Sequence, residues 1–427
     1  MQPVIIGGGW SGLSAAVYLA QAGQKPLLLE AAKQLGGRAR SVQWQNTLID
    51  NGQHLMIGAY RHMLDLIHCI GVDEQDVFHR KTLELSIFDP LFPAIHFSAS
   101  KVLPWPLALL PKLYQSLGWR DLMAFLRFFR TLHGSRITPD MTVEQWCEQS
   151  RQSSRLITQL WTPLCLAIMN TPIQQASASV FAKTLQDSLG AGSDAADLLI
   201  PVTSLGEILP APAKRYITAH NGDVRLQTRV EKILVEAGKV AGVMTNHGEV
   251  IVTDNVIVAV PPTMLRLLVS EQFAFAPVTE NPIMTIYLQF TADFRLKAPM
   301  MGFSNVLPQW LFDRSDLSPG LMAVVISGPG EHESLTKKQL IDQVVSDMKG
   351  FLPDLPAQYL SVKVIHEKRA TFSCSVAENN QRPGCKSHIQ GLLFAGDYAE
   401  NPYPATLEGA VINGYRAAKT LLTGNFP

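Results

Sequence analysis

The first residues whose spacing could do chemistry are Gly7, Gly9 and Gly12, which form a G-x-G-x-x-G pattern. They follow the apolar run 4–6 and precede apolar residues at helical spacing. At such a strand-to-helix junction the first glycine allows a tight turn, the second lets a pyrophosphate approach the backbone, and the third lets the helix pack closely. The free N–H groups of the helix N-terminus then face the phosphates. The pattern predicts a dinucleotide site.

An acidic residue supports this interpretation. A second apolar run, 27–29, ends on Glu30, which lies 18 residues after Gly12. At the end of such a strand a carboxylate can accept hydrogen bonds from ribose hydroxyls. A βαβ unit whose glycines only turn the chain would not explain an acid at this position.

Two loops after Glu30 carry further candidates. Gly36 and Gly37 permit a loop folded close to a ligand, and Arg38 can serve its phosphates. The alternative is an exposed basic turn. The loop from Asp50 to His54 is polar and contains glycine, so its backbone could lie against a flat ring. His54 is a candidate catalytic residue, and a histidine that is merely hydrogen-bonded within its loop is the alternative.

The C-terminal part repeats the arrangement of a strand followed by a helix. An apolar strand, 392–395, ends on Gly396 and Asp397, and a helix opens near Leu407. The carboxylate can bind a polyol hydroxyl. The helix N-terminus could stabilise the negative charge that develops on a reduced flavin ring.

We expect the helices and strands that position these residues to form more than one hydrophobic core. A chain of 427 residues with 47% hydrophobic residues predicts two domains. Residues 230–252 read as three short strands, and 256–260 as a buried parallel strand stopped by prolines. Residues 282–327 read as further strands, and a helix follows over 337–351.

Composition excludes several classes. Formal net charge is zero, so nucleic acid is not expected as a partner. The five cysteines are scattered, which argues against a disulfide framework or a metal site and favours a reducing compartment. The chain begins with its first strand, so we expect no removable signal peptide. No apolar run is long enough for a transmembrane helix.

Two segments could serve an apolar ligand. Residues 101–136 interleave bulky apolar residues, Trp105 among them, with lysines and arginines, as a helix lying on a membrane surface would. Pro104, Pro106 and Pro111 exclude a long straight helix there. A core-packed helical hairpin is the alternative. Residues 161–189 could wall an apolar cavity or form plain core, and the candidates are Leu164, Leu166, Ile168, Met169, Val180 and Phe181.

Taken together, these motifs resemble the FAD-dependent amine oxidase and carotenoid desaturase superfamily, over essentially the whole chain. The resemblance implies an α/β fold: a glutathione-reductase-type, Rossmann-like FAD domain, a second α+β substrate domain and a helical membrane-contacting region. We expect the FAD domain to comprise residues 1–80, 206–265 (with the β-meander) and 366–427. A mostly helical region would span 81–205, and the substrate sheet and helix 266–365.

The resemblance implies FAD as cofactor. The cofactor-binding candidates are Gly7, Gly9, Trp10, Ser11, Gly12, Glu30, Gly36, Gly37, Arg38, Gly52, Gln53, His54, Val230, Gly396, Asp397, Ala405, Thr406 and Leu407. Where amine oxidases usually place an aromatic residue over the flavin, this chain has Thr406, which disfavours amine oxidation.

A closer resemblance is to the squalene-associated FAD-dependent enzymes, the hydroxysqualene dehydroxylases of bacterial hopanoid synthesis. Its carrying residues are 50–54 with 58–60, 163–167 with 170–172, 176–178, 187–190 and 201–205. It implies reductive removal of an allylic hydroxyl, a polyisoprenoid substrate, an external electron donor, and a cytoplasmic location on the inner face of the membrane. Candidates for the proton that the leaving oxygen needs are His54, Asp50 and Tyr403.

Two other readings stay open. One is an oxidative polyisoprenoid desaturase or an amine oxidase. The other is a protein of the same fold that escorts prenylated lipids without flavin, against which Glu30, Arg38 and Asp397 argue.

Overall fold

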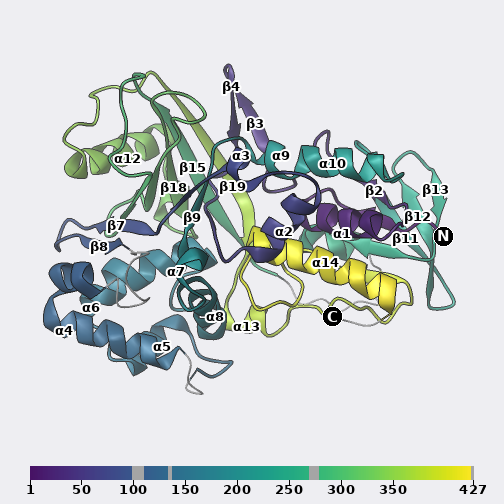
Figure 1. The fold of residues 1–427 in the computed structure, drawn as a ribbon, viewed down its shortest axis with the longest axis horizontal. Helices are drawn as coiled ribbons and strands as arrows, with labels where there is room; N and C mark the ends of the chain where they lie inside the picture. The colour runs from purple at the N-terminus through teal and green to yellow at the C-terminus, as the bar shows by residue number, and fades with distance from the viewer. Residues whose placement is uncertain (99–109, 133–136, 269–277, 425–427) are drawn as a thin grey trace.

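The computed structural model describes residues 1–98, 110–132, 137–268 and 278–424 (Figure 1). A parallel sheet with helices on its faces lies at one end of the molecule. A larger sheet with a covering helix lies at the other end, and a group of helices packs below that sheet (Figure 1).

The parallel sheet has the strand order β10-β2-β1-β14-β20, with every pair parallel. All residues of β1, β2, β14 and β20 are apolar and buried, as parallel strands covered on both faces require. The edge strand β10 carries charged residues and is partly exposed. The bounds are β1 (Val4–Ile6), β2 (Leu27–Leu29), β10 (Asp223–Arg225), β14 (Val256–Val258) and β20 (Leu392–Phe394).

The first and last long helices pack against each other beside this sheet (Figure 1). They are α1 (Trp10–Gln21) and α14 (Leu407–Thr423). Gly414 permits the contact, because a methyl group there would lie 2.1 Å from the carbonyl oxygen of Ser11. The surrounding elements are α2 (Arg61–Cys69), α9 (Leu205–Ile208), α10 (Pro210–Ala219), and the antiparallel meander β11 (Val230–Glu236), β12 (Lys239–Thr245) and β13 (Val250–Val252).

The second sheet has the order β19-β15-β18-β17-β16-β7-β8. Residues alternate across it: Leu311 and Val324 belong to the core that α12 (Lys337–Phe351) also joins, whereas Trp310 and Val325 face the opposite side. The bounds are β7 (Glu84–Phe88), β8 (Ile95–Ser98), β15 (Glu280–Gln289), β16 (Met300–Phe303), β17 (Trp310–Asp313), β18 (Leu321–Ser327) and β19 (Ser361–Phe372).

The helical group packs around aromatic side chains. Phe128 stacks between Trp146 and Trp161, with ring centroids 3.9 and 4.0 Å away. The group comprises α4 (Leu110–Thr131), α5 (Val143–Gln149), α6 (Ser154–Leu156), a π-helical turn (Ile157–Trp161), α7 (Thr162–Met169) and α8 (Ala178–Leu189).

Short elements join these parts. They are the hairpin β3 (Ser41–Trp44) and β4 (Thr47–Asp50), the small sheet of β5 (Met56–Ile57), β6 (Phe78–Lys81) and β9 (Leu198–Pro201), the helices α3 (Glu74–Val77), α11 (Pro262–Leu268) and α13 (Val376–Asn379), and two 3₁₀ turns (Ser193–Ala196 and Glu331–Ser334).

The structure differs from the expected division of the chain at two places. The region expected to be mostly helical, 81–205, begins with β7 and β8, which complete the second sheet. The boundary expected at 365/366 falls inside β19. Both differences arise because these strands pair with residues distant in the chain, which local patterning does not reveal.

The proline-rich segment also differs in detail. Pro104 and Pro106 lie outside the described residues. Pro111 sits in the first turn of α4, where a proline costs no helical hydrogen bond. The break in α4 comes instead at Gly118, with φ 71°. No helix in the described part of the chain is long and apolar enough to cross a membrane.

Candidate active site

The glycine turn between β1 and α1 has the geometry that phosphate binding requires. Gly7 has φ +106°, and a methyl group on Gly12 would lie 1.9 Å from the carbonyl oxygen of Gly7. Gly9 is the N-cap of α1 and makes no side-chain cap, so the first N–H groups of the helix face outward. Gly37 packs so closely against Gly9 that a methyl group on Gly37 would lie 3.1 Å from Cα of Gly9.

The Glu30 carboxylate shapes this turn as well as facing the cavity. Its Oε2 accepts from the N–H of Gly8 at 2.6 Å, and its Oε1 accepts from the N–H of Ala32 at 2.7 Å. Each carboxylate oxygen can accept more than one hydrogen bond, so ribose hydroxyls can still be bound.

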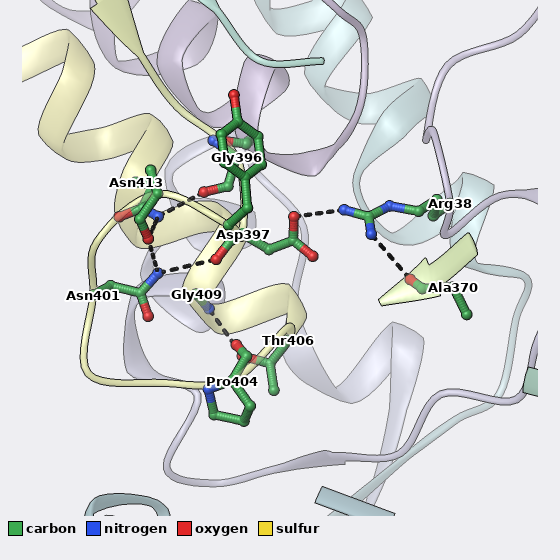
Figure 2. A network of polar contacts seen from close by, with 12 residues as sticks. Arg38, Ala370, Gly396, Asp397, Asn401, Pro404, Thr406, Gly409 and Asn413 are labelled. Atoms are coloured by element: carbon green, nitrogen blue, oxygen red, sulfur yellow. Dashed lines mark hydrogen bonds and ion pairs between the residues drawn. The ribbon is translucent and has the colours of Figure 1, made fainter. Parts of the chain in front are cut away.

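Arg38 joins the first part of the chain to the last. Its Nη2 donates to Oδ1 of Asp397 at 2.5 Å, and its Nη1 donates to the carbonyl oxygen of Ala370 at 3.0 Å (Figure 2). The ion pair lies at the carboxyl end of β20 and holds Asp397 beside the glycine turn.

The loop after Asp397 depends on two residues that sequence reasoning missed. Asn413 donates from Nδ2 to the carbonyl oxygens of Gly396 and Ala399, at 2.6 and 2.9 Å. Arg382 donates to a series of carbonyl oxygens at 2.7 to 3.3 Å, those of Asp397, Tyr398, Ala399, Asn401 and Tyr403. Arg382 stands in a loop without any motif around it, so only the folded chain reveals its role.

Thr406 caps the last helix. Its Oγ1 accepts from the N–H of Gly409 at 3.1 Å, and α14 begins at the next residue, Leu407 (Figure 2). Glu408, in the first turn, is buried and accepts from the N–H groups of His62 and Met63 at 3.0 and 2.9 Å. Burial raises the pKa of Glu408 to about 7.

The residues of the loop from Asp50 to His54 do not all line the cavity. Gln53 and His54 line the cavity, and Oε1 of Gln53 is buried without a partner among the described residues. His54 contacts the carbonyl oxygen of Gly52 through Nδ1 at 2.8 Å. A carbonyl can only accept, so Nδ1 carries the proton and Nε2 of the neutral ring is an acceptor. Burial lowers the pKa of His54 and favours this neutral ring.

Asp50 and Tyr403 do not line the cavity. Oδ1 of Asp50 accepts from the N–H of Leu205 at 2.8 Å, and burial raises the pKa of Asp50 to about 6. The hydroxyl of Tyr403 donates to Asp187 at 2.5 Å, and Asp187 also pairs with Lys183 at 2.8 Å. The three proposed proton donors therefore do not converge on one point.

One cavity of about 960 Å³ connects the cofactor candidates with an apolar wall. Of the proposed cofactor residues, Gly12 alone does not line it, since its place is in the contact between α1 and the turn. Leu164 and Ile168 line the cavity, whereas Met169, Val180 and Phe181 are core. The apolar wall comes from the helices and the second sheet: Leu83, Leu85, Phe97, Phe125, Phe129, Trp161, Leu164, Ala167, Ile168, Met264, Leu268, Ile283, Met300, Trp310, Phe312 and Val325.

These residues fit a flavin dinucleotide. The Gly9–Gly37 approach leaves no room for side chains where a pyrophosphate would lie. Gln53, whose Oε1 has no partner among the described residues, lines the same cavity, as does Val230 at the start of the meander. No group of residues in the described ranges could hold a metal ion.

The family model for flavin-containing amine oxidoreductases matches residues 10–422. The chain belongs to this family. It is an FAD-dependent oxidoreductase on an FAD-binding Rossmann-like fold with a second domain.

Relatives of this flavoenzyme include a hydroxysqualene dehydroxylase of Zymomonas mobilis, 26% identical over 98% of each chain. A 15-cis-phytoene desaturase of Solanum lycopersicum is 25% identical over 99% of this chain and 78% of its own. Among solved structures, an oxidoreductase from Methanosarcina mazei superposes with a TM-score of 0.78 at 15% identity, covering 99% of this chain and all of the other.

Proposed function

We propose that the flavoenzyme acts on a polyisoprenoid and reductively removes the allylic hydroxyl of hydroxysqualene, which gives squalene. The observation that carries the proposal is the continuity of the cavity, which extends from His54 and Asp397 to a wall of aliphatic and aromatic side chains. Charged residues line the cavity as well, and of these Glu280 interacts with Arg38 and Asp397, at the predicted cofactor end. The apolar wall suits a long hydrocarbon. The name and full-length coverage of the Zymomonas relative support the same substrate class.

Reduced FAD, when bound, supplies a hydride. As the new C–H bond forms the C–O bond breaks, and the oxygen leaves as water once it has been protonated. His54 is the one proposed proton donor that lines the cavity. Its neutral tautomer presents an acceptor, so His54 must first be protonated, and its lowered pKa confines that state to acidic pH. Asp50 and Tyr403 would act as positioning residues.

The test is a single turnover without oxygen. Purified holoenzyme is reduced anaerobically and mixed with hydroxysqualene while the flavin spectrum is followed and the lipids are extracted. Reoxidation of the flavin together with squalene supports the proposal. A flavin that stays reduced contradicts it. His54→Gln keeps the size and polarity of the side chain, so a loss of turnover with unchanged flavin content would assign the proton transfer to His54.

An oxidative function would require the opposite reaction, in which the substrate reduces the oxidised flavin. The phytoene desaturase relative favours it, because that protein also matches over nearly the whole chain. A desaturase would reduce its oxidised flavin with a saturated polyprene, and an amine oxidase with an amine. Purified protein without flavin absorbance would favour the lipid escort instead.

The proposal includes a membrane surface, from which an insoluble substrate would be drawn, and an external electron donor. The outer face of α4 supports it, because Tyr114 and Trp119 are 55% and 65% exposed. Lys112, Arg120, Arg127 and Arg130 are exposed on the same helix. The buried side of α4 supplies Phe125 and Phe129 to the cavity. Residues 101–109 and 133–136 of this segment lie outside the described residues. We place the flavoenzyme on the inner face of the cytoplasmic membrane.

A further inference from the structure

Trp310, which lies in the sheet wall of the cavity, carries a hydrogen-bond donor. Trp310 and Phe312 alternate with Leu311 along β17, and both line the cavity while Leu311 packs toward α12. Trp310 is 4% exposed, and its Nε1 is buried without a hydrogen-bond partner among the residues that the structure describes. Such a buried indole N–H normally finds an acceptor.

The residues that flank Trp310 along the sheet offer its side chain no strong acceptor. Trp310 lies in register with Val325 on one side and with Gly302 on the other. A methyl group at Gly302 would lie 2.8 Å from Cζ3 of the indole, so the ring rests on bare backbone. Met300 and Phe312 complete the surroundings along the sheet. All of these side chains lack a strong acceptor.

The residues paired in register with Trp310 across the sheet end near Gly52, in the loop predicted to contact the flavin. Val325 is paired with Thr285 on β15, and a methyl group at Gly52 would lie 3.9 Å from Oγ1 of Thr285. Two strand spacings, roughly 10 Å, thus separate the backbone of Trp310 from that of Thr285.

We propose that the indole N–H of Trp310 donates a hydrogen bond to the hydroxyl oxygen of the substrate, and that this contact makes the cavity favour the alcohol over its hydrocarbon product. The inference rests on the proposed function, in which the substrate has one oxygen and the product has none. The alcohol satisfies the donor, whereas the hydrocarbon leaves it unpartnered in an apolar wall. Trp310 would therefore promote release of the product.

The experiment measures binding to the oxidised holoenzyme, in which no hydride is available and no turnover occurs. Hydroxysqualene and squalene are titrated separately in the same detergent, and the perturbation of flavin absorbance gives each Kd. The readout is the ratio of the squalene Kd to the hydroxysqualene Kd, because partition into micelles cancels when this ratio is compared between variants.

Trp310→Phe keeps an aromatic ring and removes the N–H, and Phe312→Leu is the matched control on the same strand and the same wall. We expect Trp310→Phe to lower the ratio by roughly tenfold and Phe312→Leu to leave the ratio unchanged. An unchanged ratio in Trp310→Phe, or an equal fall in both variants, would overturn the inference. Failure of the proposed function shows separately, as wild-type reduced enzyme that does not convert hydroxysqualene.

Discussion

Arg38 and Asp397 lie 359 positions apart in the sequence, yet Nη2 of one donates to Oδ1 of the other at 2.5 Å. The carboxylate is 8% exposed and the guanidinium 27%, so water screens the pair only partly. The pair joins the loop after β2 to the loop after β20 at the edge of the cavity. A cofactor that spans the glycine turn and the N-terminus of α14 must pass this point.

Replacing Asp397 tests this relationship. Asp397→Asn keeps the shape but removes the charge that balances Arg38 and an acceptor for ribityl hydroxyls. We expect the purified variant to carry several-fold less FAD, measured as the ratio of flavin to protein absorbance. Asp342→Asn, on the exposed face of α12, is the control and should retain the wild-type ratio. Full flavin content in Asp397→Asn would show that the carboxylate is dispensable.

Arg382 should matter as much, although it does not line the cavity. Its bonds hold the carbonyl groups of residues 397–403 in one conformation. Arg382→Gln leaves most of those carbonyls without this donor, so we expect weaker FAD binding and faster proteolysis of the loop. Limited proteolysis with mass spectrometry locates the cleavage. The prediction fails if cleavage occurs at the wild-type rate.

Two glycine substitutions separate close packing from helix propensity. Gly12→Ala would place Cβ 1.9 Å from the carbonyl oxygen of Gly7, whereas Gly350→Ala meets no atom within 4 Å. We expect Gly12→Ala to lose FAD and to lower Tm by several degrees or more. Gly350→Ala should keep its flavin and be neutral or slightly stabilised. The ratio of flavin to protein absorbance measures the FAD content, and thermal unfolding followed by far-UV circular dichroism gives the Tm of each variant.

The parallel sheet and the glycine turn at its edge could be predicted because their signals are local. Gly7, Gly12 and Glu30 lie within one βαβ unit, and the apolar strands at 256–258 and 392–394 are continuous. Each of these patterns depends only on neighbouring residues.

What escaped prediction depends on contacts across the chain. β7 pairs in parallel with β16, more than 200 residues later, and the alternation of β7 does not reveal which strand it will pair with. Arg382 gains its role, and Trp310 its proposed role, from groups that only the fold brings near. The proton-donor candidates show the same limit, because residue type suggested Asp50 and Tyr403 while their partners in the fold hold them away from the cavity.

The exposed face of α4 provides a test of membrane contact. Trp119 and Met123 are 65% and 40% exposed, one turn apart. Trp119→Ser combined with Met123→Ser removes apolar area without touching a residue that lines the cavity. We expect flotation with anionic vesicles to fall several-fold. The control pair Leu267→Ser and Leu360→Ser changes exposed leucines elsewhere and should float as wild type does. Equal losses in both pairs would argue against a specific face.

Glu408 should make the protein less stable as pH rises toward neutrality. Burial raises its pKa from 4.5 to about 7, so the native state keeps a proton that the unfolded chain releases above pH 4.5. The stabilising contribution is complete below pH 4.5 and disappears as pH rises through 7. The shift corresponds to a change on the order of 3 kcal/mol in the free energy of unfolding.

Glu408→Gln removes this titration, and Asp50→Asn is its matched comparison, because the pKa of Asp50 is raised only to about 6. Urea unfolding of the apoprotein at a series of pH values gives the free energy for each variant. We expect the wild-type decline between pH 4.5 and 7 to shrink in Glu408→Gln. In Asp50→Asn it should shrink mainly below pH 6, since each group acts between its unfolded and its folded pKa. If the free energy of unfolding depends on pH in the same way in wild type and Glu408→Gln, the native carboxylate of Glu408 stays ionised. The hydrogen bonds from the two backbone N–H groups would then lower its pKa by more than burial raises it.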